Sequence, residues 1–358
     1  MPDTQPSPVG IKPDIQALTP DRTKQTRHLH GGRLEISPLC VLCVSVVKPP
    51  SVAVIDIGSN SIKILIAARD RTGRIKAVKA RTLDARISAG ISAAKPALSE
   101  EGMTRGLGAI RELLAEAEEY SPKKTMLVAT SAVRDATNGA TFRQRVKSAT
   151  RQEIRVLTGA EEANYIGRGL TCDPELEELQ DFYVFDLGGG SLECLSFKKR
   201  KITQAVSLQL GCVRLTEKFF KNSAAPLTVE ETTALAKHVR DELKQSGFKF
   251  ALTAPAAVFT GGSMSTVRAI KGARHQPRME DTPTIIGTDT LGEMLDELGP
   301  LNLEQRKALP GMPAARADVF AAALITMVTL ADYAHVDRFH HSLHNLRWGI
   351  AAEALDLL

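Results

Sequence analysis

Two stretches of this chain share a pattern that could bind phosphate. Residues 52–66 read VAVIDIGSNSIKILI, and residues 182–197 read FYVFDLGGGSLECLSF. In each stretch an apolar run ends in an aspartate, a turn rich in glycine and serine follows, and a second apolar run begins. A turn of this composition between two strands presents several backbone N–H groups with few side chains in the way, and such a nest cradles phosphate oxygens.

The aspartate beside each turn, Asp56 or Asp186, would repel a bare phosphate, but it would attract one through a divalent cation placed between them. The alternative is a tight hairpin in which glycine serves only the backbone conformation. Two copies in matching places favour phosphate binding. The predicted phosphate-binding residues of the turns are Asp56, Gly58, Ser59, Asn60 and Ser61 in the first copy and Gly188, Gly189, Gly190 and Ser191 in the second.

A third glycine turn and a pair of hydroxyl residues extend this set. Residues 259–263 read FTGGS after an apolar strand, so Gly261 and Gly262 are candidates for a further phosphate or ribose loop. Thr130 and Ser131 stand at the end of another predicted strand, where their hydroxyl groups can donate hydrogen bonds.

Arg134 and Asn138 lie one helical turn apart near a predicted helix start, so they share a face. Arginine is the natural bidentate partner of phosphate. The alternative is a capped helix with a solvated arginine.

Three glutamates could supply a catalytic or metal-binding carboxylate. Glu161 and Glu162 stand at a predicted helix N-terminus, where the helix dipole alone would favour them. Adjacent helical residues point about 100° apart, so only one of the two could face a cleft and orient a water molecule. Glu193 lies in an otherwise apolar strand and therefore needs a partner, for which a metal ion would serve.

Length and composition limit the class of protein. The 358 residues suffice for two ordinary domains or one large one, and 43% hydrophobic with 24% charged residues is typical of a globular chain. Aromatic residues make up 4%, which argues against stacking platforms for single-stranded nucleic acid. A net charge of +5 permits an anionic substrate without identifying one. The five cysteines are irregularly spaced and no clear secretory signal is present, which favours reduced thiols in a cytosolic protein.

The first fifty residues differ from the rest. Their one apolar stretch, residues 38–47, is too short to span a bilayer, which needs roughly 20 residues. Cys40 and Cys43 within it have no second ligand pair at a suitable distance for a metal site. We expect a disordered leader, a strand-like extension or a start codon assigned too early, in preference to a targeting segment.

The remainder predicts the same α/β plan twice, because three strands lead each half and helices and strands then alternate. The first half is expected to hold strands at 52–58, 62–70 and 74–87, a helix capped by Ser99, a strand and turn at 124–133, a helix to about Ala149, a strand at 153–159 and a helix from residue 160. The second is expected to hold strands from 182, 193 and 201, a helix from 213, a helix capped by Thr228 and ending at Gly247, a strand at 256–260, a helix from Thr290 and a long apolar helix at 315–334. Two domains facing each other across a cleft, with ligands at the carboxyl ends of strands, would follow.

These motifs together resemble the exopolyphosphatase / guanosine pentaphosphate phosphatase (Ppx/GppA) family, within the actin–sugar kinase–Hsp70 superfamily. The matching stretches cover roughly residues 51–350 in the family's order: AVIDIGSNSIKILI, ATSAVRDATN, LTGAEEA, VFDLGGGSLE, SLQLGCVRLTE, FTGGS, LPGMPAARADVFAAAL and NLRWG. Two Asp–Gly turns alone would suit the whole superfamily, whereas TSAVRDATN and TGAEEA point to this family.

The resemblance implies an α/β fold of two duplicated actin/Hsp70-like (ribonuclease H-like) domains, with mixed sheets flanked by helices and an interdomain cleft. The domains are expected at residues 51–177 and 178–358, after a leader at 1–50, with the last helix able to pack back on the first domain. The length is similar to that of the short, two-domain members of the family.

The resemblance also assigns roles to residues. Glu162 matches the catalytic carboxylate, and Asp186 and Glu193 match the residues that serve the metal, Mg²⁺ or another divalent cation. Arg134 and Asn138 match the arginine and asparagine of the family's TSAxRxAxN pattern, and we expect Arg134 to take part in catalysis. Arg316 matches an arginine of the second domain expected near the cleft.

We therefore expect an exopolyphosphatase, a phosphoric anhydride hydrolase that removes the terminal phosphoryl group of inorganic polyphosphate by attack of a water oriented by Glu162. The alternatives are a guanosine pentaphosphate 5′-phosphohydrolase of alarmone metabolism, a non-catalytic alarmone- or polyphosphate-binding module, and a sugar kinase or Hsp70-like ATPase. The expected partners are polyphosphate and guanosine penta- or tetraphosphate. We expect a cytoplasmic homodimer that binds neither nucleic acid nor membranes.

Overall fold

The computed structural model describes residues 49–252, 255–275 and 281–358, and residues 48–358 form one compact unit. The leader predicted for residues 1–50, with Cys40 and Cys43, lies outside the described residues up to residue 48. Among the residues described, none of the helices combines the length and apolar character needed to cross a bilayer.

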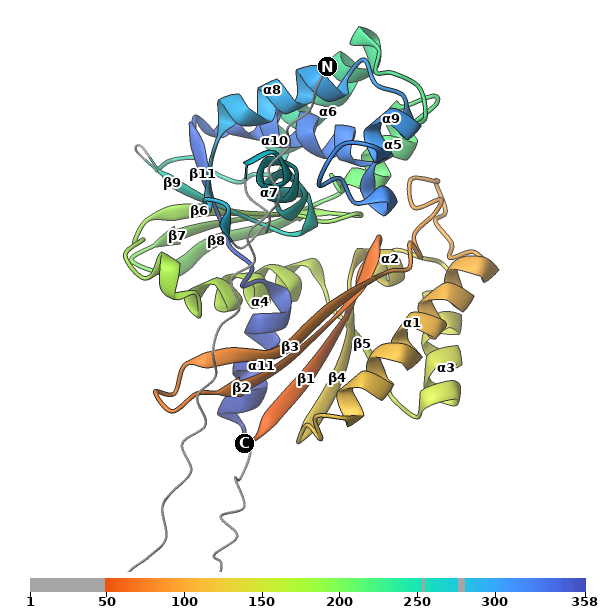
Figure 1. Ribbon diagram of the computed structural model, residues 1–358, viewed down its shortest axis with the longest axis vertical. Helices are drawn as coiled ribbons and strands as arrows, with labels where there is room; N and C mark the ends of the chain where they lie inside the picture. The colour runs from red at the N-terminus through yellow and green to blue at the C-terminus, as the bar shows by residue number, and fades with distance from the viewer. Residues whose placement is uncertain (1–48, 253–254, 276–280) are drawn as a thin grey trace, which may run out of the picture. The chain divides into compact units, whose positions relative to one another are not determined.

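The chain builds two mixed sheets flanked by helices, as expected (Figure 1). Up to the end of the first sheet and its following helix, the elements are β1 (Ser51–Ile57), β2 (Ser61–Arg69), β3 (Ile75–Asp84), α1 (Glu100–Glu118), β4 (Lys124–Ala129), α2 (Ser131–Arg134), α3 (Gly139–Thr150), β5 (Ile154–Val156) and α4 (Gly159–Thr171). The later elements are η1 (Pro174–Leu176), β6 (Phe182–Leu187), β7 (Leu192–Lys198), β8 (Lys201–Leu208), α5 (Cys212–Phe219), α6 (Val229–Gln245), β9 (Ala256–Thr260), α7 (Gly262–His275), β10 (Ile285–Gly287), α8 (Thr288–Leu298), α9 (Leu303–Lys307), η3 (Ala314–Arg316), α10 (Phe320–Ala334), β11 (Arg338–His341) and α11 (Leu346–Asp356).

The two sheets repeat one topology. The first has the order β3-β2-β1-β4-β5, and the second contains the corresponding order β8-β7-β6-β9-β11 with β10 added at its edge. In both, the leading strand is antiparallel to the next strand along the chain and parallel to the strand on its other side. We call β1–β5 with α1–α3 the N-terminal lobe, and β6–β11 with α5–α10 the C-terminal lobe.

Several element boundaries differ from those expected. The strand and turn expected at 124–133 are present as β4, which ends at Ala129, and the one-turn helix α2. Helix α8 begins at Thr288, two residues before the expected cap, and α10 begins at Phe320, after the separate turn η3. The caps by Ser99 and Thr228 are present, and each hydroxyl oxygen accepts a backbone N–H three residues on.

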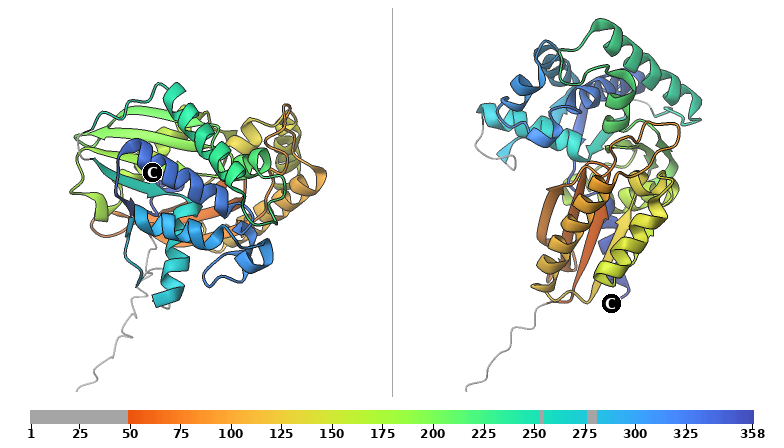
Figure 2. Two further views of the ribbon diagram at one scale, coloured as in Figure 1. Left: turned by 90° about the horizontal axis from the view of Figure 1, so that it is seen from above. Right: turned by 90° about the vertical axis from the view of Figure 1, so that its right-hand side faces the viewer.

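Helices cover both faces of the first sheet. Alternate residues of β1 divide between two cores: Ala53, Ile55 and Ile57 pack with α1 and α3, while Val52 and Val54 pack with α4 and α11. Figures 1 and 2 show α1 and α3 on one face of this sheet and α11 on the other. The core around α4 and α11 also includes residues of the second sheet such as Val184 and Leu195, so these two helices join the lobes.

Glycine lets α4 and α11 cross at backbone contact. An added Cβ at Gly349 would lie 1.9 Å from the carbonyl oxygen of Tyr165, and one at Gly169 would lie 2.2 Å from that of Asn345. Both obstacles are backbone atoms, so a side chain at either place would force the helices apart. Glu162 lies in the first turn of α4 and Asn345 is the N-cap residue of α11, so the crossing fixes these two residues relative to one another.

We predict that Gly349→Ala destabilises the protein by about 1–3 kcal/mol, since one methyl group overpacks this crossing. Thermal unfolding followed by circular dichroism measures the effect. The matched control is Gly108→Ala within α1, where a new Cβ meets nothing within 4 Å. It should raise stability by about 0.5–1 kcal/mol through helix propensity. Equal unfolding temperatures for the two variants would contradict the tight crossing.

Candidate functional site

The two glycine-rich turns have the same internal geometry. The N–H of Gly58 donates to the carbonyl oxygen of Ser61 at 3.2 Å, and the N–H of Gly188 donates to that of Ser191 at 3.0 Å. The duplicated sequence pattern is therefore a duplicated structural unit.

Next to each turn, the register of the two antiparallel strands brings two charged residues opposite one another. Asp56 is directly opposite Lys63 on β2, and Asp186 is directly opposite Glu193 on β7. Directly opposed residues of antiparallel strands project from the same face of a sheet. The first copy thus places a carboxylate opposite a lysine without an ion pair between them, whereas the second places two carboxylates opposite one another.

The turns of the two lobes touch, and glycine makes this contact possible. Within the N-terminal lobe, the hydroxyl oxygens of Ser59 and Ser131 lie 3.2 Å apart and form the surface that the second turn meets. An added Cβ at Gly189 would lie 2.8 Å from the Cβ of Ser59, and one at Gly190 would lie 2.3 Å from the Oγ of Ser131. Side chains on the second turn would therefore push the lobes apart.

A cavity between the lobes collects most of the predicted site residues. It encloses about 590 Å³ of space, including its opening to solvent. The predicted residues that line it are Asp56, Gly58, Ser59, Asn60, Ser61, Thr130, Ser131, Glu162, Asp186, Gly188, Gly189, Ser191, Glu193, Gly261, Gly262 and Arg316.

Three predicted residues do not line this cavity. Gly190 supports the contact between the turns. Arg134 lies behind Glu162 and donates to its carboxylate at 2.8 Å. The amide of Asn138 accepts from the N–H of Leu98 and donates to its carbonyl oxygen, both at 2.8 Å, so it fastens a loop.

The two adjacent glutamates of α4 lie in different environments. Glu161 completes a capping box with Thr158 and forms an ion pair with Arg155, and the hydrogen bonds from Thr158 and then Arg155 lower its pKa to about 2. Glu162 is buried and lines the cavity. Burial, and then repulsion from Glu193, raise the pKa of Glu162 well above its usual range, and the hydrogen bond from Arg134 offsets this only in part.

The other cavity carboxylates are also held in an unfavourable environment for charge. Burial raises the pKa of Asp186 to about 6. Burial and then the charge of Asp186 raise the pKa of Glu193, although the hydroxyl of Ser207 donates to it at 2.7 Å. Burial likewise raises the pKa of Asp56, whose Oδ1 accepts no hydrogen bond from the described residues. This concentration of buried acidic groups would be relieved by a bound cation.

The donor set fits a hard divalent cation. Asp186 and Glu193 offer carboxylate oxygens from opposed positions of one sheet face, and Mg²⁺ is commonly held by one or two carboxylates together with waters and substrate phosphates. Within the described ranges, no group of three or more His, Cys, Asp and Glu side chains forms a complete cage for a metal. A cation bound here would therefore need oxygens from the substrate or water as well.

Cations line the same cavity without protein counter-charges in contact. In the described part of the chain, Lys63 and Arg316 make no side-chain hydrogen bond or ion pair. Burial, and then repulsion from Arg347, lower the pKa of Lys63 to about 8. An added Cβ at Gly262 would lie 1.9 Å from the Nη2 of Arg316, so the third glycine turn makes room for this guanidinium.

Several residues of this region had no functional role predicted from the sequence. Lys63 and Asn345 line the cavity, and Arg347 faces an adjoining pocket that also includes Lys63 and Arg316. The sequence did contain a signal for Lys63, because it follows Asp56 by seven residues, as Glu193 follows Asp186. The other two lie in NLRWG, a stretch that matched the family but carries no recognisable chemistry by itself.

The assembled groups suit chemistry on a phosphorylated anion. Two backbone nests and unpaired cations can bind phosphate oxygens, paired carboxylates can hold a cation, and Glu162 can accept a proton. Phosphoryl transfer requires mainly such positioning and charge stabilisation.

Comparisons with known proteins agree with this chemistry. The sequence profile of the Ppx/GppA phosphatase family matches residues 65–357. Exopolyphosphatase 2 of Mycobacterium tuberculosis is 30% identical over 316 residues, covering 84% of this chain and 97% of the relative. The crystal structure of an exopolyphosphatase from Cytophaga hutchinsonii superposes with a TM-score of 0.78 at 21% identity, covering 86% of this chain and 98% of the other. The Ppx/GppA family member of Aquifex aeolicus superposes with a TM-score of 0.70 at 25% identity, again covering 86% and 98%. The chain is therefore a member of the Ppx/GppA phosphatase family.

Proposed function

We propose that this protein is an exopolyphosphatase that hydrolyses the terminal phosphoryl group of inorganic polyphosphate. The observation that carries the proposal is the meeting of Glu162, both phosphate turns and the Asp186–Glu193 pair in one cavity. The name of the Mycobacterium tuberculosis relative favours polyphosphate over a nucleotide.

The protein's own groups would act on the substrate as follows. Backbone N–H groups of the turns at 58–61 and 188–191, with Lys63 and Arg316, bind the oxygens of the terminal phosphates. Glu162 orients the attacking water and accepts its proton as the new P–O bond forms and the bridging P–O bond breaks. Arg134 fixes the orientation of the Glu162 carboxylate through their 2.8 Å contact.

A divalent cation, Mg²⁺ or a similar ion, would be held through Asp186 and Glu193. It would supply charge neutralisation at the transferring phosphoryl group. The pKa directions support this assignment, because both carboxyl groups gain from a nearby positive charge.

The family name also covers phosphatases of guanosine pentaphosphate, so that nucleotide is the second candidate substrate. Measuring kcat/KM for phosphate release from polyphosphates of defined length and from guanosine pentaphosphate in parallel decides between them. The homodimer and the cytoplasmic location remain predictions from the sequence.

We predict that Glu162→Gln lowers kcat for phosphate release from polyphosphate by about 10²–10⁴-fold, since the amide cannot accept the proton. Binding of tripolyphosphate, measured by calorimetry, should change little because the turns and cations remain. The matched control is Glu161→Gln, which removes the neighbouring carboxylate but affects only the helix cap and the surface ion pair with Arg155. Wild-type turnover by the Glu162 variant, or equal losses in both variants, would refute the role of Glu162.

We predict that Asp186→Asn stabilises the metal-free protein at pH 7.5. The folded protein holds the pKa of Asp186 at about 6 rather than 3.8, so the folded state binds more protons than the unfolded state between these values. Stability is therefore lost as the pH rises through this window, by up to about 3 kcal/mol. The wild-type minus variant difference in unfolding free energy should shrink towards pH 4.

The same pair of proteins tests the metal site without an activity assay. Saturating Mg²⁺ should raise the unfolding temperature of the wild type above pH 6 and have little effect on the Asp186→Asn variant, because binding to the folded state alone stabilises it. An equal response to Mg²⁺ in both proteins would exclude Asp186 as a ligand.

A further inference from the structure

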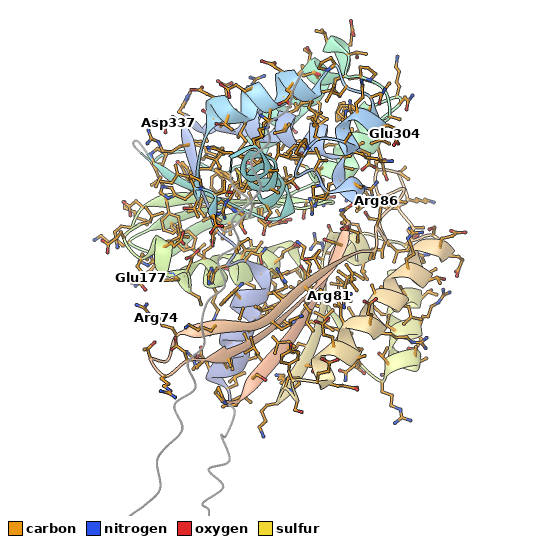
Figure 3. The ribbon with its side chains drawn as sticks, viewed as in Figure 1. Arg74, Arg81, Arg86, Glu177, Glu304 and Asp337 are labelled. Carbon is orange, nitrogen blue, oxygen red and sulfur yellow. The ribbon has the colours of Figure 1, made fainter. Side chains whose placement is uncertain are left out.

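Two arginines outside the cavity link the lobes in the same way. Arg86 follows β3 of the N-terminal lobe, and Arg214 lies in α5, which follows β8 of the C-terminal lobe. They therefore occupy comparable places in the duplicated topology. Arg86 is labelled in Figure 3, where it lies between the lobes.

Each arginine first binds the phosphate turn of its own lobe. The backbone N–H and Nε of Arg86 donate to the carbonyl oxygen and Oδ1 of Asn60, at 2.9 and 3.1 Å. The backbone N–H of Arg214 donates to the carbonyl oxygen of Gly189 at 3.2 Å, and its Nε donates to that of Gly190 at 3.0 Å.

The terminal nitrogens of each guanidinium then reach the opposite lobe. Arg86 forms a bidentate pair with Asp318 and donates to the carbonyl oxygen of Ala315 at 2.7 Å. Arg214 contacts Asp135 at 2.6 Å and donates to the carbonyl oxygen of Ile91 at 2.8 Å. In both cases the partners across the boundary are one aspartate and one backbone carbonyl, although Arg86 binds its aspartate through two nitrogens and Arg214 through one. We call these two sets of contacts the arginine clasps.

Each clasp ends beside a group that the proposed function uses. Ala315 and Asp318 flank Arg316, which lines the cavity. Asp135 lies 3.5 Å from the Nε of Arg134, whose Nη1 lies 2.8 Å from Glu162. A chain of alternating charges therefore runs from the second phosphate turn through Arg214, Asp135 and Arg134 to Glu162.

The backbone conformation of Arg86 is energetically unfavourable by itself, which indicates that the contacts of the clasp hold it in place. Its φ is 34°, a left-handed value that is uncommon for residues other than glycine. Such a conformation persists when the surrounding contacts over-determine it and is typical of functional sites. The loop after Arg86 is also fixed from the other lobe, because Glu217 of α5 accepts the N–H groups of Gly90 and Ser92 at 2.8 and 3.0 Å.

We propose that Arg86 and Arg214 are positioning residues for the hydrolysis. Each holds the phosphate turn of its own lobe in place relative to a reacting or phosphate-binding group of the site: Arg316 for the Arg86 clasp and Glu162 for the Arg214 clasp. This inference rests on the proposed function, since it assigns the clasps to that same cavity.

The two clasps should differ in the kinetic parameter they control. Lysine keeps the charge but cannot serve several acceptors in fixed directions, so Arg214→Lys and Arg86→Lys should loosen the clasps. Because the Arg214 clasp ends at Glu162, its loss should lower kcat for polyphosphate at least about 10-fold with KM nearly unchanged. Because the Arg86 clasp ends at Arg316, its loss should raise KM at least about 10-fold with a smaller effect on kcat.

The matched control is Arg74→Lys. Arg74 pairs with Glu177 at 3.4 Å, both side chains are more than half exposed, and both residues, labelled in Figure 3, lie outside the turns at 58–61 and 188–191. Exposed pairs of this kind contribute little, so kcat and KM should stay at wild-type values. Unchanged kinetics in Arg214→Lys and Arg86→Lys, or the same change in the control, would overturn the proposal.

Substituting the aspartate partner in the opposite lobe tests the same clasp if a lysine variant fails to fold. Asp135→Asn should reproduce the fall in kcat, and Asp318→Asn the rise in KM. The double variant Arg214→Lys/Asp135→Asn should be no worse than the more damaged single variant, because the two residues act through one contact. Losses that multiply would show independent roles and would contradict the clasp.

Amide hydrogen exchange separates this inference from the proposed function. If the wild type released phosphate from neither polyphosphate nor guanosine pentaphosphate, the proposed function would fail while the clasps could still be tested. Arg214→Lys should then raise exchange at residues 188–191 and 90–92, whereas Arg74→Lys should not. Unchanged exchange in the Arg214 variant would overturn the clasp itself.

Discussion

The close contact between two glycine-rich turns is the constraint on which the rest of the structure depends. Backbone N–H groups from both lobes can surround one small anion only if nothing larger than hydrogen projects from Gly189 and Gly190 where they meet Ser59 and Ser131. The glycine crossing of α4 and α11 has the same effect at the other side of the cavity. The lobes are thus held at a separation set by backbone atoms, which adjust less readily than side chains.

Charge is distributed unevenly around this contact. The C-terminal lobe supplies Asp186 and Glu193, while the matching position in the N-terminal lobe holds Lys63. Burial makes both kinds of charge unfavourable in the cavity, as the raised pKa of Asp186 and the lowered pKa of Lys63 indicate. A cation near the first group and phosphate oxygens near the second would satisfy both, and this is the arrangement that the proposed function requires.

Local patterns in the sequence were enough to predict the Asp–Gly turns and the helix caps, which follow from spacing along one strand or one helix. Spacing also predicted that only one of Glu161 and Glu162 could face a cleft, but the choice of Glu162 came from the family resemblance. Contacts between distant segments could not be predicted this way. Arg86 and Asp318 are 232 positions apart, and nothing near either one signals the other. Arg347 and Asn345 were missed for the same reason, because their importance comes from where α11 inserts.

The position of α11 has a consequence for biosynthesis. Asn345 and Leu346, at the start of this helix, line the cavity formed by strands that begin almost three hundred residues earlier. Domains generally fold as units during synthesis, with the N-terminal part first. The phosphate turns of this protein can therefore form on the ribosome well before the cavity has all its walls. The cavity would therefore stay incomplete until α11 has left the exit tunnel and packed against α4 and the first sheet.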